Sequence, residues 1–128
     1  VVVKEEDYKR FLIVAMENEK FALSIDYLRE IILSDVSYTN IAGSPKELLG
    51  LITLREEVVT VIDLRTYYGF NPVMNEKNRI LIASHNGDTI GMLVDDIIDI
   101  KSVINKDIKI MEICGGHTNV IMKYGIYH

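Results

Sequence analysis

The sequence lacks the features that mark secreted and membrane-spanning proteins. Cys114 is the only cysteine, so no disulfide can form within the chain, and we expect a reducing cytoplasm as its compartment. The longest apolar run, FLIVAM at residues 11–16, is far shorter than the roughly 20 residues that span a bilayer. The start of the chain, VVVKEEDYKR, turns acidic at once and shows no signal-peptide pattern. We therefore expect no direct membrane insertion.

An excess of positive charge is also missing. The chain has 14 basic and 19 acidic residues, which give a formal net charge of −5 at pH 7. Nucleic-acid-binding domains typically carry a basic stripe, so we expect no nucleic-acid partner. The composition is otherwise that of a globular protein, and folding at this length buries roughly two thirds of the unfolded surface. That is enough for a core without metal or disulfide.

Apolar runs of strand length dominate what is present. Runs rich in β-branched residues and separated by turn signals predict an all-β barrel or sandwich. The dipeptide Asn86-Gly87 predicts a hairpin, and residues 17–20 are predicted to join the first two strands. The runs are FLIVAM, KFALSI, LLGLITL, VVTVIDL, RILIAS, TIGMLV, IIDIKSVI and NVIMKYGIY.

Helical periodicity is confined to one short segment. DYLREIIL, residues 26–33, is predicted as a helix with Ser24 or Asp26 as its N-cap, and a second helical turn is predicted to start at Ser44-Pro45. The segment YYGFNPVMNEKN, residues 67–78, has the glycine, proline and polar residues of a boundary. We expect an N-terminal extension at 1–10, one lobe at about 11–70 and a second at about 71–128.

Few residues have the spacing of an active site. Cys114 and His117 stand three residues apart, but a zinc site takes three or four protein ligands, and the other histidines lack ligand spacing. Asp95, Asp96 and Asp99 could do acid–base work or hold Mg²⁺, yet strand alternation places Asp96 on the opposite face from the other two. We predict no catalytic residue, no cofactor and no metal. A small metal-dependent enzyme using these five residues is the alternative.

The hairpin predicted at residues 48–65 carries charge where a turn usually has Asn or Gly. Arg55 and two glutamates separate its apolar runs, and Asp63 and Arg65 close its far end. A guanidinium offers five donors in a rigid fork, which suits recognition or a carboxylate between lobes. An exposed arginine alone contributes little to stability. On the residues alone, a recognition site and a solvated tip both stay open.

Two stretches in the first half of the chain resemble the CheW-like coupling family of bacterial chemotaxis. FALSIDYLREII, residues 21–32, is similar to the family's strand-to-helix segment, with Glu30 in its characteristic place before isoleucine. TNIAGSPKELLGLITLR, residues 39–55, is similar to the loop and strand that follow. Pro45, Gly50 and Arg55 stand at matching places in it.

Two further stretches follow in the family's order. VVTVIDLR, residues 58–65, is similar to the return strand that ends in Asp-Leu-Arg. TIGMLVDDIIDI, residues 89–100, is similar to the Gly-x-x-Val-Asp stretch of the second lobe. The resemblance covers residues 11–125, nearly the whole chain.

The resemblance implies two five-stranded SH3-like β-barrel lobes with one or two short helices, and no catalysis. Family members are cytoplasmic adaptors that join the cytoplasmic tips of chemoreceptors to a histidine kinase, whose regulatory domain has the same fold. The receptor's helical hairpin lies in a groove between the lobes, and barrel ends pair with the kinase's barrels. We therefore expect recruitment to membrane-associated receptor arrays.

The resemblance also implies which residues carry these contacts, and it places Glu30 on a helix close enough to Arg55 for an ion pair. The residues implied for partner binding are Glu30, Ile32, Val36, Leu54, Arg55 and Glu56. The residues implied to support that surface are Gly50, Asp63, Arg65, Gly91, Val94 and Asp95.

The chain departs from the family's pattern in two places that matter. Glu56 stands where a glycine usually follows the arginine, so we expect a turn of another type or a strained one. The family continues after its Tyr-Gly region with a return strand and a terminal helix, so we expect the second lobe to be completed by residues beyond His128 or in another way. The alternative within the family is a domain of a larger chain, either the kinase's regulatory domain or a coupling protein fused to a receiver domain.

Overall fold

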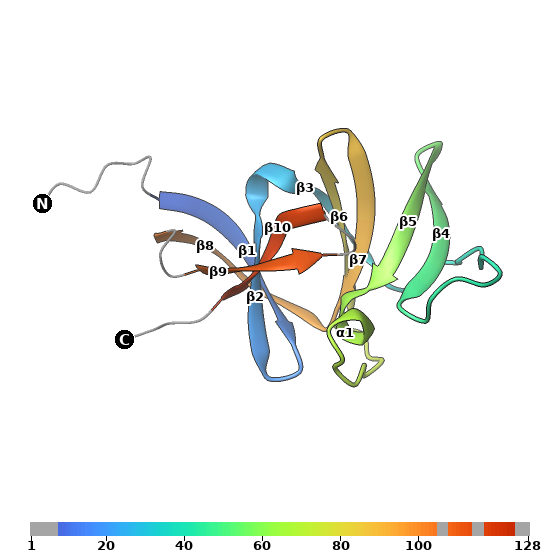
Figure 1. Ribbon diagram of the computed structural model, residues 1–128, viewed down its shortest axis with the longest axis horizontal. Coiled ribbons are helices and arrows are strands. Elements are labelled where there is room, and N and C mark those ends of the chain that lie inside the picture. The colour runs from blue at the N-terminus through green and yellow to red at the C-terminus, as the bar shows by residue number, and fades with distance from the viewer. Residues whose placement is uncertain (1–7, 105–107, 114–116, 125–128) are drawn as a thin grey trace, which may run out of the picture.

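The chain folds almost entirely into strands, which form two five-stranded sheets (Figure 1). The computed structural model describes residues 8–104, 108–113 and 117–124, with side chains from 9 to 102. Sheet 1 has the order β8-β1-β2-β10-β9 and sheet 2 the order β3-β6-β7-β5-β4. The strands are β1 Tyr8–Met16, β2 Glu19–Ser24, β3 Leu28–Leu33, β4 Leu48–Leu54, β5 Glu57–Asp63, β6 Arg79–His85, β7 Asp88–Val94, β8 Asp96–Ile104, β9 Ile108–Ile113 and β10 His117–Tyr124.

Sheet 1 gathers strands from both ends of the chain, whereas sheet 2 is built from the middle. Neighbouring strands are antiparallel, except that β5 and β7 run parallel. The helical elements are η2, a 3₁₀ turn at Ile25–Tyr27, and α1, Leu64–Tyr67. Two five-stranded sheets with little helix confirm the predicted all-β fold and fit two SH3-like lobes. The division near residues 67–78 stays a prediction; that segment connects α1 to β6 of sheet 2.

Both predicted helices are wrong. Residues 28–33 form β3, whose side chains alternate between half-buried and exposed, and only Ile25–Tyr27 turns as a 3₁₀ helix. The spacing of the apolar residues fitted a helix, but adjacent isoleucines favour a strand, and pairing with β6 decides the outcome. Ser24 as N-cap is confirmed, because its Oγ accepts from the Asp26 amide at 3.3 Å. At Ser44-Pro45 the chain makes one turn, closed by Leu48 N–H to Pro45 C=O at 3.1 Å.

The central strands of sheet 2, β6 and β7, are buried on both faces over most of their length. Successive residues of β6 alternate between two cores, because side chains of a strand point to opposite faces. Leu81 lies in the core between the sheets, and Ile80 and Ile82 lie in a second core, whose buried residues all come from sheet 2. Strands buried on both faces have near-continuous apolar sequences, which explains runs such as RILIAS and TIGMLV. None of the helices in the described residues is long and apolar enough to cross a membrane.

Candidate functional site

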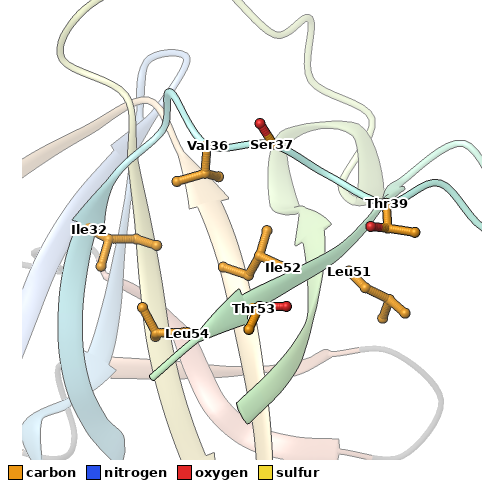
Figure 2. Close-up of a pocket in the computed structure, with 8 residues that line it drawn as sticks. All are labelled: Ile32, Val36, Ser37, Thr39, Leu51, Ile52, Thr53 and Leu54. Atoms are coloured by element: carbon orange, nitrogen blue, oxygen red, sulfur yellow. The ribbon is translucent and has the colours of Figure 1, made fainter. Parts of the chain in front are cut away.

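An open pocket of about 430 Å³ lies between β3, the segment that follows it and β4 (Figure 2). Ile32, Val36, Ile52 and Leu54 project toward one another across it. The other lining residues are Ser37, Thr39, Leu51 and Thr53. The fold thus brings together three residues that the resemblance implies for partner binding, Ile32, Val36 and Leu54. An apolar interior with hydroxyl groups at its margin can take an apolar side chain from another molecule.

The wall of this pocket requires a glycine. Thr39 forms an isolated bridge with Leu51, with N–H to C=O distances of 2.8 and 2.9 Å. The backbone at Thr39 passes so close to Gly50 that an ideal Cβ on Gly50 would lie 2.5 Å from the Thr39 carbonyl oxygen. Gly50 also has φ +139°, a value that residues with side chains rarely adopt. Gly50 therefore holds the 34–40 segment against β4.

The tip of the β4–β5 hairpin is strained. Leu54 pairs with Glu57, so the turn consists of Arg55 and Glu56, whose φ values are 49° and 69°. Two central residues with positive φ are typical of a type I′ turn, which favours Asn and Gly. The strained turn expected from Glu56 in place of glycine is the one observed, and both residues are exposed.

The predicted ion pair between Glu30 and Arg55 is confirmed. Arg55 Nη1 lies 2.7 Å from Glu30 Oε2. The Arg55 side chain is 77% exposed and that of Glu30 only 19%. The resemblance had implied that Glu30 lies on a helix, but it lies on strand β3. The pair anchors an exposed guanidinium beside the pocket, because Leu54 precedes Arg55 and Ile32 follows Glu30 by two residues.

A second ion pair at the same tip was missed by the sequence analysis. Arg29 Nη1 lies 3.0 Å from Glu57 Oε2 and donates to Thr89 Oγ1 at 3.2 Å. Thr89 and Ser84 share a hydrogen bond of 2.9 Å. The hydrogen bond from Arg29 is the main cause that lowers the pKa of Glu57 below its ordinary value. The only signal in the sequence was the adjacency of opposite charges at 29–30 and again at 55–57.

The base of the hairpin is a buried arginine. Arg65 is 1% exposed, and it binds both carboxylate oxygens of Asp63, through Nε at 2.9 Å and Nη2 at 3.1 Å. Asp63 Oδ1 also caps α1 by accepting from the Arg65 amide at 3.0 Å. Arg65 Nη1 donates to Asp95 Oδ1 at 3.0 Å. Burial lowers the pKa of Arg65, but the hydrogen bonds that Arg65 donates to Asp63 and Asp95, with the negative charges of these two groups, outweigh burial and raise the pKa above its ordinary value.

The same arginine ties the two sheets together. Its Nη1 also donates to the Asn78 side chain at 3.3 Å, and Asn78 donates from Nδ2 to the Asp95 carbonyl at 3.0 Å. The second oxygen of Asp95 accepts from the Glu17 amide at 2.7 Å, in the β1–β2 turn of sheet 1. Asn78 is fully buried and was missed by the sequence analysis, because its neighbours indicated only a polar turn.

The other predicted residues lie apart from the pocket. Val94 is buried in the core between the sheets, and Gly91 lies in β7, where an ideal Cβ would be 2.9 Å from Val61 Cγ2. Asp96 and Asp99 each accept one local amide, from Ile97 and Ile100, at 2.8 Å.

The residues of the metal-enzyme alternative form no ligand group where the structure describes them. Within the described residues, no three His, Cys, Asp or Glu side chains cluster as a metal site. Cys114 lies outside the described residues, and so does the side chain of His117. Asp95 is bound to Arg65, so it does not face the two neighbouring aspartates as a shared site would require.

Known proteins resemble this chain in sequence and in fold. A sequence model of the CheW-like domain matches residues 10–124. The chain is 30% identical over 102 residues to the chemotaxis protein CheW of Klebsiella aerogenes, covering 79% of this chain and 61% of the relative. It is 27% identical over 104 residues to that of Helicobacter pylori, covering 80% and 62%.

A solved structure agrees with these matches. The scaffolding protein TtCheW of Thermoanaerobacter tengcongensis superimposes with a TM-score of 0.73 at 27% identity, over 80% of this chain and 70% of that one. Against the two curated relatives, the chain spans about three fifths of their length, 61% and 62%.

Proposed function

Because this chain belongs to the CheW-like domain family, we propose that it is an adaptor that couples the cytoplasmic tips of chemoreceptors to a chemotaxis histidine kinase. The relatives are chemotaxis and scaffolding proteins rather than enzymes. In this role the protein acts in the cytoplasm, recruited to membrane-associated receptor arrays. Its partners are the regulatory domain of the kinase and the helical hairpin at the receptor tip.

The observation that carries the proposal is the apolar pocket beside the Glu30–Arg55 pair. Interfaces concentrate binding energy in an apolar anchor that enters a pocket, with charged residues at the rim. Ile32, Val36 and Leu54 provide such a pocket, and Arg55 stands exposed at its edge. We assign this surface to the kinase regulatory domain. Arg55 and Glu56 then orient the approaching domain through their opposite charges.

Exposed apolar side chains on the edge strands suit the receptor tip. Ile31 is in register with Leu81, and Ile100 with Leu12, so both point to the faces that meet in the core between the sheets. They are nevertheless 39% and 48% exposed. An amphipathic helical hairpin can lay its apolar face on such residues. The exposed large apolar residues of these two strands are Ile31 and Leu33 on β3, and Ile98 and Ile100 on β8.

The test is a titration of the protein against the kinase regulatory domain and against a receptor-tip fragment. Arg55→Ala should weaken kinase-domain binding by about tenfold or more, since a charge-assisted contact contributes about 1.5–3 kcal/mol. Its melting temperature should move little, because the side chain is largely exposed. Arg55→Lys keeps the positive charge but loses the two-pronged guanidinium. Its affinity for the kinase domain should therefore lie between those of the wild type and Arg55→Ala. Arg10→Ala, which removes an exposed arginine of β1, is the matched control.

The receptor arm of the test uses the edge strands. Ile31→Ser and Ile100→Ser should weaken binding of the receptor-tip fragment and leave the kinase domain bound as before. The adaptor proposal fails when the wild-type protein does not bind both partners. Unchanged affinity of Arg55→Ala for both partners would reduce Arg55 to a solvated hairpin tip.

A further inference from the structure

A bulge in β3 makes the second ion pair at the hairpin tip possible. Leu28 is in register with Ala83 and Glu30 with Ile82, so Arg29 has no register partner on β6. A bulge adds one residue to a strand and re-aims the side chains beside it. As a result, two consecutive residues of β3, Arg29 and Glu30, both reach the β4–β5 tip.

These contacts span strands that are not neighbours. In sheet 2, β6 and β7 separate β3 from β5, so no backbone ladder of this sheet joins β3 to the tip. Arg29 reaches across to Glu57 on β5 and to Thr89 on β7, and Thr89 is bound to Ser84 on β6. The side-chain chain Ser84–Thr89–Arg29–Glu57 thus connects all four strands at one end of the sheet.

The charges of the two pairs specify one position of the tip. Along β3 the order is positive then negative, at Arg29 and Glu30. The tip offers Glu57 to the first and Arg55 to the second. A shift of the tip that exchanged the partners would bring Arg55 to Arg29 and Glu57 to Glu30, and like charges repel. Two pairs of opposite polarity therefore define a register that one pair alone leaves free.

The position of the tip also shapes the pocket. Leu54, which lines the pocket, is the last residue of β4 and is followed directly by Arg55. Ile32 lines the opposite side, two residues after Glu30 on β3. Both ion pairs join β3 to the tip, so they set the separation between these two side chains. Because Arg55 and Glu56 have positive φ, the tip is strained, and we expect its backbone to relax when an ion pair is lost.

We propose that Arg29 and Glu57 are positioning residues for the adaptor's contact with the kinase. Their ion pair, braced by Thr89 and Ser84, holds the strained tip where Arg55 and the pocket meet a partner. The role in binding rests on the proposed function. The role in holding the tip does not, and the two are tested separately.

The first measurement needs no partner. Amide hydrogen exchange of residues 54–58 is compared between wild type, Arg29→Gln and Glu57→Gln under native conditions. Each variant should speed exchange at the tip about two- to fivefold, the range for a solvent-exposed ion pair. The amides of β1 and β2 report on the rest of the fold and should keep their rates. Arg10→Gln, which removes an exposed arginine from sheet 1, is the control whose charge change equals that of Arg29→Gln.

The second measurement is binding of the kinase regulatory domain. Arg29→Gln and Glu57→Gln should each weaken it about two- to fivefold, while neither residue is required to touch the partner. The double variant should bind no more weakly than either single variant, because both remove the same interaction. Arg10→Gln should bind like the wild type.

The outcomes separate the two ideas. Unchanged exchange at the tip in both variants overturns the positioning role. So does faster exchange with unchanged binding, or a double variant whose effect is the sum of the two. A wild-type protein that does not bind the kinase domain contradicts the proposed function, and the exchange rates then decide by themselves whether the pair holds the tip.

Discussion

The β4–β5 and β6–β7 hairpins of sheet 2 have the same kind of turn built from different residues. φ is 49° and 69° at Arg55 and Glu56, and 52° and 85° at Asn86 and Gly87. Asn-Gly adopts this conformation readily, whereas other residues in it cost about 1–2 kcal/mol each. The turn of charged residues at the β4–β5 tip is therefore less stable than an Asn-Gly turn, and the ion pairs to β3 offset part of that loss.

The two hairpins share their base. Asp63 ends β5, Asn78 precedes β6 and Asp95 follows β7, and all three bind Arg65. One turn follows ordinary preferences and the other contradicts them, although the same buried group anchors both. Residues that break a local rule in an otherwise consistent fold are commonly found at functional sites. The contrast therefore supports the proposal that the β4–β5 tip contacts a partner.

Removal of the shared base should have the largest effect, because it affects both hairpins. Arg65→Met leaves the buried Asp63 carboxylate without its partner, and breaking a buried pair costs about 3–5 kcal/mol. We expect the free energy of unfolding, measured in urea, to fall by about that amount. Arg79→Met, in which a less buried arginine of the same sheet loses its bonds to backbone carbonyls, is the control. A loss below about 1 kcal/mol would mean that solvent replaces Arg65 easily.

The next largest effect compares one glycine in each hairpin. Gly50→Ala would place a Cβ against the backbone of Thr39 at a φ of +139°, and we expect a loss of about 3 kcal/mol. Gly91→Ala meets the side chains of Val61 and Ile80, which can shift, and should cost about 1–2 kcal/mol. Thermal unfolding of both variants checks the order. Equal losses would show that the backbone at Thr39 moves as freely as a side chain.

The sequence predicts the parts of this comparison that depend on local chemistry. Asn86-Gly87 was predicted as a hairpin turn and is one, and strand-length apolar runs predicted the all-β fold. The helix predicted at residues 26–33 was wrong because its apolar spacing fits both structures, and the pairing with β6 that decides for the strand cannot be seen in the local sequence. The sequence order likewise does not reveal that β5 pairs with β7 in parallel.

The candidate site was predictable only in part. Glu30 and Arg55 were paired through the family resemblance, not by any property of their spacing. Arg29 and Glu57 meet only after β3 and β5 take their places in sheet 2, so nothing local marks them. Asn78 is similar: a polar residue in a turn becomes a buried donor to Asp95 and acceptor from Arg65 once these two residues are placed beside it.

Exchange of the two turns should have a smaller effect of opposite sign. Replacing Arg55-Glu56 with Asn-Gly removes the strain and should raise the free energy of unfolding by about 1 kcal/mol, after the loss of the exposed pair to Glu30. The same variant should bind the kinase domain less well. The reverse exchange, Arg-Glu in place of Asn86-Gly87, should lower the free energy of unfolding, because it introduces the strain of positive φ at two residues that do not favour it. If Asn-Gly destabilises the β4–β5 hairpin, the ion pairs outweigh the turn.

The smallest effect concerns pH, which acts on the β4–β5 tip through the Arg29–Glu57 ion pair. The hydrogen bond from Arg29 lowers the pKa of Glu57, so the folded state favours the charged carboxylate. The stability from this pair is present above the unfolded pKa of glutamate, about 4.3, and is lost as pH falls through the lower folded pKa. Because the Glu57 side chain is 41% exposed, the change should be slight.

Urea unfolding midpoints of Glu57→Gln and wild type should therefore differ at pH 6 and converge near pH 3. Parallel profiles for Glu57→Gln and wild type would mean that Arg29 does not stabilise the charged form, and that the β4–β5 tip is as insensitive to acid as Asn86-Gly87.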